Sequence, residues 1–268
     1  MQRTIFITGT SSGLGKATVI LFQSKGWHVI ATMRYPDKEM ELKKLDNITL
    51  FELDVTNPKN IKEVVNKTIS EHSVDVVLNN AGYGLIGPLE AFTDEQITRQ
   101  IETNLMGPIR VTKSFVPYFR EKKTGMFINI TSMFGMIGYP TCSMYVASKF
   151  ALDGFSESLA YDLSHFGVKV KIIAPGGIQT DFSGRSMDTA TYDAYQGLID
   201  KVSEGYNEES IKRYSTPEMV ANAIFKAATD NNNQLRYIVG SDAEALYNER
   251  LNISPEGQYK KIQEIFSF

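Results

Sequence analysis

Short runs rich in β-branched and aromatic residues alternate with longer helical patterns along this chain, and this alternation limits its fold more than any other feature. In the first half the short runs lie at 4–8, 28–32, 49–53 and 74–78, and one of the helical patterns between them covers 37–45. The second half continues with short runs at 125–130, 169–174 and 235–239. Strand–helix–strand units of about 30 residues form parallel sheets with helices on both faces. The pattern therefore predicts an α/β fold with a doubly wound parallel sheet.

The length and charge of the chain narrow the number of domains and the class of partner. Its 268 residues fit one or two domains, but no linker rich in Pro, Gly or Ser divides them, so we expect a single domain over 1–268. The 28 basic and 31 acidic side chains give a net charge of −3, which argues against a nucleic-acid partner.

Cysteines, histidines and apolar stretches exclude further classes. Cys142 is the only cysteine, which rules out an intrachain disulfide, and the three histidines lie too far apart in sequence for a metal motif. We therefore expect no metal. Residues 124–148 carry no charge, but polar side chains interrupt them too often for a membrane span. The N-terminal apolar run is too short for a signal-peptide core, so we expect a cytoplasmic protein.

A glycine-rich turn, TGTSSGLG at 8–15, joins the first predicted strand to the first predicted helix. Glycines let a backbone approach a pyrophosphate, and a helix N-terminus offers free N–H groups and the positive end of its dipole. The turn therefore predicts dinucleotide binding through Gly9, Ser11, Ser12, Gly13 and Leu14. A glycine-rich turn without a ligand is the alternative.

The same residues, Gly9 to Gly13, also match the GxSxG elbow of serine hydrolases. That class needs a histidine downstream, and His165, inside a predicted helix, is the only late one. An elbow on the first strand also leaves no earlier strand loop to supply the second oxyanion donor. The hydrolase is therefore the weaker interpretation.

Two tyrosine–lysine pairs have the four-residue spacing that places both side chains on one helix face. They are Tyr145 with Lys149 and Tyr118 with Lys122. Ser132 lies thirteen residues before Tyr145, in a loop after the predicted strand 125–130, whereas a leucine holds the same place before Tyr118. Ser132, Tyr145 and Lys149 are therefore the predicted catalytic residues.

Taken together, the motifs resemble the short-chain dehydrogenase/reductase superfamily from about residue 3 to 182, and onward to Val239. The motifs, in the family's order, are TGTSSGLG, Asp54-Val55, NNAG at 79–82, Asn104, Ser132, Tyr145-x-x-x-Lys149 and PGGIQT at 175–180. The resemblance implies a single-domain Rossmann fold with a parallel sheet of about seven strands. It also implies a homodimer or homotetramer and an NAD or NADP cofactor.

The resemblance also implies roles for individual residues. The glycine turn lines the phosphates, Asp54 and Val55 meet the adenine, and Asn80, Ala81 and Gly82 contact the ribose side. Pro175 and Gly176 belong to a further cofactor-binding turn, in which Ile178 and Thr180 hold the nicotinamide carboxamide. Asn104 anchors a water that relays protons behind Lys149. The alternative for Asn104 is a polar residue that interrupts a helix and is satisfied by backbone.

These residues suit the interconversion of a carbonyl and a secondary alcohol, which needs a hydride donor and a proton donor at the oxygen. The pKa of a phenol is near 10. Lys149 and a positive nicotinamide both favour the tyrosinate form of Tyr145, and Ser132 holds the substrate oxygen in line. We therefore predict an oxidoreductase with Tyr145 as general acid and base. A dinucleotide-sensing protein without catalysis is the second hypothesis, and loss of Tyr145 or Lys149 would mark it.

The end of the second predicted strand favours NADP(H) over NAD(H). An acidic residue about 20 positions beyond the glycine turn binds the ribose hydroxyls and repels a 2′-phosphate. Here Met33 stands at that place, Arg34 follows it, and no acid occurs before Asp37. A guanidinium pairs with phosphate in a bidentate way. The alternative is that Asp37 folds back to serve NAD.

The segment 183–215 interrupts the sheet pattern and is predicted to be a substrate lid. Its tyrosines either line a lipophilic pocket or pack the lid on itself; they are Tyr192, Tyr195, Tyr206 and Tyr214. The stretches Ala31–Arg34 and PGGIQTDF look like the hydroxysteroid and retinol dehydrogenase branch. This likeness suggests a small-molecule substrate that is a bulky, lipophilic alcohol or ketone.

Overall fold

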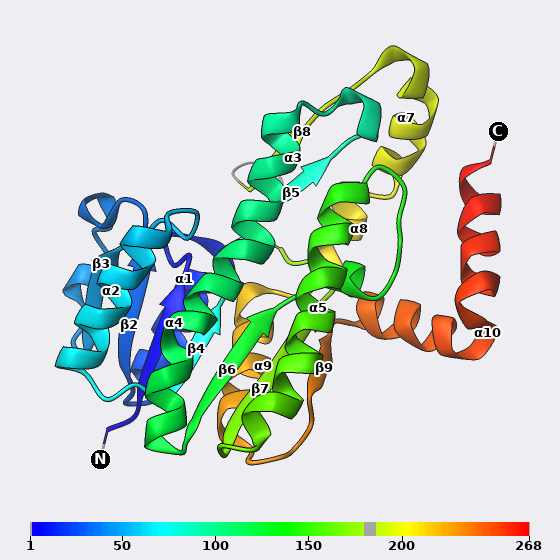
Figure 1. The fold of residues 1–268 in the computed structure, drawn as a ribbon. Helices are drawn as coiled ribbons and strands as arrows, with labels where there is room; N and C mark the ends of the chain where they lie inside the picture. Colours follow the sequence, from blue (N-terminus) through cyan, green and yellow to red (C-terminus); the bar gives the residue numbers. More distant parts are fainter. Residues whose placement is uncertain (1, 180–185, 268) are drawn as a thin grey trace.

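Seven parallel strands form the central sheet of the computed structural model, which describes residues 2–179 and 186–267 (Figure 1). The strands are β1 (Thr4–Thr8), β2 (His28–Met33), β3 (Ile48–Glu52), β4 (Val76–Asn79), β6 (Gly125–Ile130), β7 (Val168–Pro175) and β9 (Arg236–Val239). Their order across the sheet is β3-β2-β1-β4-β6-β7-β9, and every pairing is parallel. The predicted single α/β domain with a doubly wound sheet is confirmed.

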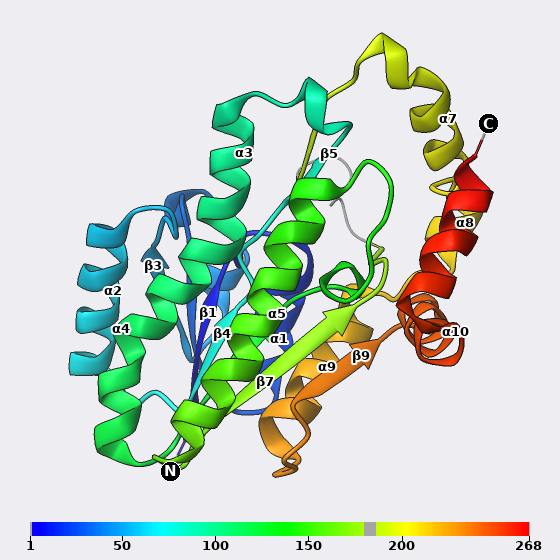
Figure 2. The same ribbon diagram turned by 45° about the vertical axis from the view of Figure 1, so that its right-hand side comes forward.

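Helices cover both faces of the sheet, as Figures 1 and 2 show. The helices α1 (Gly13–Ser24) and α9 (Pro217–Thr229) pack on one face, and α2 (Pro58–Glu71), α4 (Gly107–Lys122) and α5 (Ser143–Ser164) pack on the other. Alternate residues of β1 point into two separate cores: Ile5 and Ile7 toward α1, Phe6 toward Phe115 of α4. Both faces of the central strands are therefore buried, which explains why these strands read as nearly continuous apolar runs, while the edge strands β3 and β9 are partly exposed.

The remaining elements lie outside this three-layer core. They are α3 (Asp94–Ile101), a π-helical turn η4 (Glu102–Met106), the strands β5 (Gly84–Ile86) and β8 (Met187–Thr189), α7 (Gln196–Glu204), α8 (Glu208–Lys212), α10 (Ser241–Phe266) and the short 3₁₀ turns η3 (Leu89–Ala91), η5 (Met133–Gly135) and η6 (Asp193–Tyr195). Strands β5 and β8 form a small parallel sheet of their own. Within the described ranges, no helix is both long and apolar enough to cross a membrane.

The helix predicted over 37–45 is wrong. Two 3₁₀ turns, η1 (Pro36–Lys38) and η2 (Leu42–Lys44), replace it. Between them the buried carboxylate of Glu39 accepts hydrogen bonds from the backbone N–H groups of Glu41 and Leu42 at 2.8 and 3.1 Å, and from Lys16 Nζ at 3.2 Å. These bonds give the backbone an alternative to helical pairing, so the segment follows the sheet edge without forming a regular helix.

Candidate active site

The predicted cofactor and catalytic residues gather at one edge of the sheet, where the parallel strands reach their carboxyl ends. Asn104 lies in the π-helical turn η4, and the other described members lie in or just after a strand or on the helix that follows. The strand order reverses between β1 and β4, and open α/β sheets bind ligands in the crevice outside such a reversal. Thr180 lies outside the described residues. The structure thus brings the described members of the predicted set to one edge.

The glycine turn is packed so closely that side chains would not fit at two of its glycines. Gly9 has φ +73°, and a Cβ there would lie 2.7 Å from Ala81 Cα. A Cβ on Gly15 would lie 2.2 Å from the Gly9 carbonyl oxygen. The start of α1 and the Asn80–Gly82 loop therefore both pack directly against the glycine turn. The cradle has the form that close approach to a phosphate requires.

Thr8 ties the glycine turn to that loop, although sequence reasoning assigned it no role. Its buried hydroxyl accepts hydrogen bonds from the backbone N–H groups of Asn80 and Ala81 at 3.0 and 3.1 Å. The Asn80 amide in turn donates to the carbonyls of Thr8 and Gly9, both at 2.9 Å. The only signal in the sequence was its place as the last residue of the strand before the turn.

The start of α1 fits an anionic group. The N-cap residue Ser12 makes no side-chain capping bond, and the first turn of the helix holds no acidic residue. Its first N–H groups and the positive end of its dipole are therefore available to a phosphate.

Asp54 follows β3, and one of its carboxylate oxygens accepts hydrogen bonds from the backbone N–H and the hydroxyl of Thr56 at 2.9 and 2.7 Å. These bonds fix the loop after β3.

Tyr145 and Lys149 lie on the first turns of α5, beside the end of β6. Lys149 is 6% exposed, and its Nζ donates to the Ile130 carbonyl at 2.9 Å and lies 5.7 Å from the centroid of the Tyr145 ring. Ser132 is buried, follows β6, and accepts at its hydroxyl from the Phe134 backbone at 3.1 Å. The three side chains that sequence spacing selected therefore stand together.

The second tyrosine–lysine pair lies at the opposite edge of the sheet. Lys122 Nζ donates to the Val74 carbonyl at 2.8 Å and forms an ion pair with Asp75 at 3.1 Å, and the Tyr118 hydroxyl lies 3.4 Å from the same carbonyl. These contacts hold the residues just before β4. The pair thus has a structural surrounding that explains its spacing without chemistry.

Burial determines the protonation of the two groups on α5. It raises the pKa of Tyr145 to about 12, although hydrogen bonding with the Ser132 side chain acts in the opposite direction. Burial also lowers the pKa of Lys149 to about 8. The sequence analysis expected Lys149 to favour the tyrosinate form of Tyr145. In the structure, the loss of solvation on burial has a larger effect on the pKa of Tyr145 and raises it. Tyr145 therefore holds its proton at neutral pH.

Asn104 lies in the π-helical turn η4, close to Lys149. A Cβ on Gly82 would lie 3.2 Å from Asn104 Oδ1 and 3.7 Å from Lys149 Nζ, so the glycine separates the two groups. The Asn104 amide accepts from the Tyr83 N–H at 3.0 Å and donates to the Tyr83 carbonyl at 2.8 Å. Its side chain is thus satisfied by backbone, as the alternative interpretation required, and its part in a proton relay stays a prediction.

The tyrosines of the segment 183–215 divide into two groups. Tyr192 and Tyr195 contact each other at 6.3 Å, and the Tyr195 hydroxyl donates to Glu90 at 3.1 Å, away from the catalytic residues. In contrast, the Tyr214 ring covers Gly177, where a Cβ would lie 2.4 Å from it. Tyr206 is 44% exposed, but burial raises the pKa of its hydroxyl. Four neighbouring side chains raise this pKa further: Cys142, Tyr139, Tyr214 and Tyr145. The Tyr206 hydroxyl therefore lies near the site.

Asp242 is a second contributor that sequence reasoning missed. It lies at the start of α10, and its Oδ2 accepts from the Gly177 N–H at 2.7 Å. A Cβ on Gly176 would lie 2.1 Å from Asp242 Oδ1, an atom that is buried and has no hydrogen-bond partner among the described residues. The Asp242 carboxylate therefore fixes the turn after β7. Its distance along the chain, 65 residues from Gly177, hid the contact.

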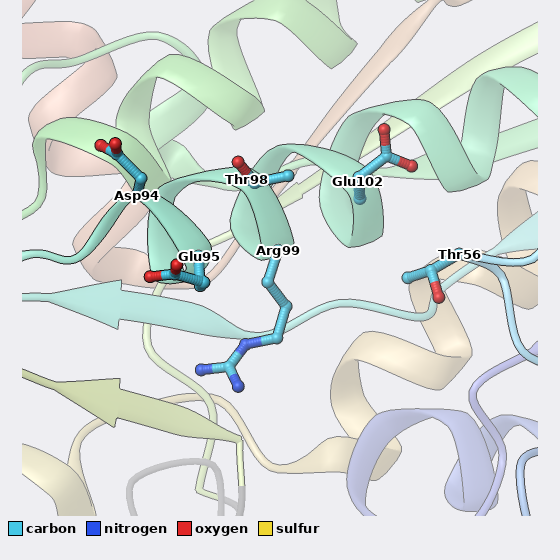
Figure 3. Close-up of a pocket in the computed structure, with 6 residues that line it drawn as sticks. All are labelled: Thr56, Asp94, Glu95, Thr98, Arg99 and Glu102. Carbon is cyan, nitrogen blue, oxygen red and sulfur yellow. The ribbon is translucent and has the colours of Figure 1, made fainter.

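A cavity of about 420 Å³ lies beside this edge, between α3 and the loop after β3 (Figure 3). Its lining is polar and charged, with Thr56, Asp94, Glu95, Thr98, Arg99 and Glu102. Arg99 projects from α3 across it and pairs with Asp188 of β8. Since Thr56 also bonds Asp54, the cavity borders the loop predicted to meet the adenine and contains none of the catalytic side chains.

Comparison with known proteins decides the family. Residues 3–191 match the family model for short chain dehydrogenases. The chain belongs to the short-chain dehydrogenase family. This membership confirms the predicted oxidoreductase class acting on CH–OH groups. It leaves the serine hydrolase unsupported, since His165 follows the last residue of α5, with its ring against Phe166.

Three curated relatives illustrate the similarity. This short-chain dehydrogenase is 39% identical to an uncharacterized oxidoreductase of Schizosaccharomyces pombe, over 78% of this chain and 88% of that protein. It is 31% identical to a 3-ketodihydrosphingosine reductase of Bacteroides thetaiotaomicron, over 98% and 97%. It is also 31% identical to retinol dehydrogenase 8 of Bos taurus, over 73% and 65%. The last similarity confirms the predicted resemblance to the retinol and hydroxysteroid dehydrogenase branch.

Two solved structures illustrate the fold. A short-chain dehydrogenase from Streptomyces avermitilis superimposes with a TM-score of 0.85 at 28% identity, over 98% of this chain and 97% of that one. ElxO with NADP bound superimposes with a TM-score of 0.75 at 28% identity, over 89% and 96%. The first match spans nearly the whole of both chains, including the C-terminal region.

We predict that Thr8→Val weakens both folding and cofactor binding. The N–H groups of Asn80 and Ala81 would lose their acceptor, which should lower the free energy of unfolding by about 1–3 kcal/mol and loosen the loop against the glycine turn. Denaturant unfolding and titration with NADPH measure the two effects. Thr4→Val is the control, because Thr4 is also buried on β1 and its hydroxyl makes no hydrogen bond within the described ranges. Indistinguishable behaviour of the two variants would contradict the assignment.

Proposed function

We propose that this short-chain dehydrogenase interconverts a carbonyl and a secondary alcohol with NADP(H), and that Tyr145 is the general acid and base. The observation that carries the proposal is the grouping of Ser132, Tyr145 and Lys149 at the sheet edge that also holds the glycine turn. Both Tyr145, which is half-buried, and Lys149, which is buried, are present side by side, so a protein that only senses a dinucleotide is not favoured.

The protonation of the site suits carbonyl reduction. Bound NADPH would supply a hydride to the carbonyl carbon. Tyr145, with a pKa of about 12, holds the proton that the substrate oxygen needs, and Ser132 holds that oxygen by a hydrogen bond. Lys149, with a pKa of about 8, carries a positive charge at neutral pH close to the phenol and favours the tyrosinate left after proton transfer. Asn104 lies behind Lys149, where a water relay would return the proton.

Arg34 supports a preference for NADP(H). It follows β2 directly, is exposed, and has no ion-pair or hydrogen-bond partner among residues 2–179 and 186–267. Asp37, the alternative ligand for NAD, has a fully exposed carboxylate that lies 3.9 Å from Lys43 Nζ, so it does not fold back toward the glycine turn. The ElxO structure, which contains NADP, is consistent with this proposal.

The substrate we propose is a bulky, lipophilic small molecule. Aromatic rings lie on one side of Tyr145: Phe134 lies 6.3 Å from its ring, and Tyr139 stacks on Phe134 at 5.3 Å. The names of two relatives, 3-ketodihydrosphingosine reductase and retinol dehydrogenase 8, also refer to lipid-like compounds. The predicted lid residues 183–185 lie outside the described residues; the rest of the segment, 186–215, would close over this substrate, and the compartment we propose is the cytoplasm.

We predict that Tyr145→Phe lowers kcat by about 100-fold or more while the affinity for NADPH changes only a few-fold. The phenol serves proton transfer, which contributes roughly 10²–10⁴ in rate, while ring packing is retained. A panel of lipophilic and small carbonyls, followed by NADPH absorbance, measures turnover. Tyr118→Phe is the matched control at the opposite edge and should keep its activity. Near-normal turnover of Tyr145→Phe would refute the assigned role.

We predict that Arg34→Ala raises KM for NADPH roughly tenfold, which corresponds to about 1.4 kcal/mol, and changes KM for NADH little. The guanidinium would lose its bidentate pairing with the 2′-phosphate. Lys25→Ala, which removes an exposed cation at the far end of α1, is the control and should leave both values unchanged. Equal losses with both cofactors would show a structural role, and a wild-type preference for NADH would overturn the assignment.

We also predict a homodimer or homotetramer in solution, with a mass two or four times the 30.0 kDa of one chain. The exposed side of α5 carries two large aromatic residues, Phe150 and Tyr161, at 39% and 71% exposure, which a partner would cover. Light scattering coupled to size-exclusion chromatography measures the mass. A monomer at micromolar concentration would contradict this prediction.

A further inference from the structure

The C-terminal helix α10 is bent, and its two halves are tied together. Ser254 has φ 68° and ψ 164°, which is not helical, and Pro255 follows it. Figure 1 shows the bend of the α10 ribbon. Across the bend, the fully buried Gln258 donates to the Leu246 carbonyl at 2.9 Å and accepts from Arg250 at 3.2 Å. These bonds between the halves fix the angle of the bend.

A cavity of about 280 Å³ lies within this angle; we call it the α10 slot. Most of its lining is apolar, and an ion pair between Glu249 and Lys261 borders it. The lining residues are Tyr139, Ala245, Leu246, Glu249, Lys261, Ile262, Ile265 and Phe266. Its volume is below the roughly 300–1,000 Å³ of pockets that hold a whole drug-sized ligand. The slot therefore suits an apolar part of a larger ligand.

Aromatic rings connect the slot to the catalytic tyrosine. Tyr139, one wall of the slot, contacts Phe266 at 5.5 Å and stacks on Phe134 at 5.3 Å. Phe134 in turn meets the Tyr145 ring edge to face at 6.3 Å. The buried ring of Phe134 thus joins the Tyr145 ring to Tyr139, so the phenol lies two ring contacts from the wall of the slot. The first half of α10 also begins with Asp242, which holds the turn at Gly177.

We propose that the α10 slot binds the apolar tail of the substrate while the carbonyl group lies at Tyr145. This inference rests on the proposed function and adds the substrate class, a carbonyl or alcohol group carried on an extended hydrocarbon chain. Burial of each methylene group should improve binding roughly fourfold until the slot is full. A short carbonyl compound would reach Tyr145 but not the slot.

The test is a series of methyl n-alkyl ketones of increasing length, assayed with NADPH and the full-length protein. We expect KM to fall by roughly fourfold per added methylene over the lengths that enter the slot, with kcat nearly constant. Ala245→Phe fills the slot and should raise KM for the longest ketone tenfold or more while leaving the shortest unchanged. A KM that does not depend on chain length would overturn the proposal.

Two further variants keep the test decisive if Ala245→Phe does not fold. Ile265→Ser places a polar group in the slot at a position that is 51% exposed, and should also weaken only the long ketones. Leu251→Ser, at a residue of α10 that is 65% exposed and outside the slot lining, should change nothing. Equal effects of Ile265→Ser and Leu251→Ser would overturn the proposal.

Direct binding separates this proposal from the proposed function. Calorimetric titration with n-alkyl alcohols of the same lengths reports the slot whether or not any ketone is reduced. Failure of every ketone to react would remove the proposed reaction only. Binding of long alcohols that Ala245→Phe and Ile265→Ser leave unchanged would remove the α10 slot only.

Discussion

Parallel strands reach their carboxyl ends at a single edge of a sheet, and in this chain the strand order reverses between β1 and β4 at that edge. Every other feature of the site depends on this constraint. The last residue of β1 and the residues after β4 become neighbours, so one hydroxyl, that of Thr8, can hold both loops. Residues more than 70 positions apart in the chain thereby form one cradle. The glycines are needed because three backbone segments meet there within contact distance.

The two tyrosine–lysine pairs lie in different surroundings at the two edges of the sheet. At the carboxyl edge burial removes solvent from Tyr145 and Lys149 and moves both pKa values toward the neutral forms, to about 12 and about 8. At neutral pH Tyr145 is then neutral and Lys149 still charged, and both groups respond strongly to a charge that arrives with a ligand, because low-dielectric surroundings screen it weakly. At the amino edge, Lys122 instead pairs with Asp75, and the tyrosine–lysine spacing serves only to anchor a strand.

Most of the fold was predictable, because a strand buried on both faces leaves a continuous apolar run that does not depend on distant contacts. The predicted strands at 4–8 and 125–130 match β1 and β6 to the residue, and 28–32 differs from β2 by one. The failure at 37–45 came from Glu39, whose carboxylate bonds the backbone and Lys16 and so replaces helical pairing. None of these three hydrogen bonds has a signature in the local sequence pattern.

The candidate site was less accessible to sequence reasoning wherever a contact joins distant segments. Motif spacing selected Ser132, Tyr145 and Lys149, since a strand end and a helix face are local features. It could not find Asp242, whose role depends on where α10 begins in space. It also could not divide the tyrosines of 183–215, because that depends on how β8 docks on β5.

The helix α10 contacts both the turn after β7, which is predicted to bind the cofactor, and the slot proposed for the substrate. Its first residues support the turn after β7 through Asp242, its first half lines the slot, and its second half returns to Tyr139. At its end the Ser267 carbonyl accepts from Lys201 of α7, which joins it to the segment 183–215. A ligand that fills the slot would therefore press on an element that also positions Gly177. One bent helix thus contacts the turn after β7, the slot and α7, although these parts of the chain lie far apart in sequence.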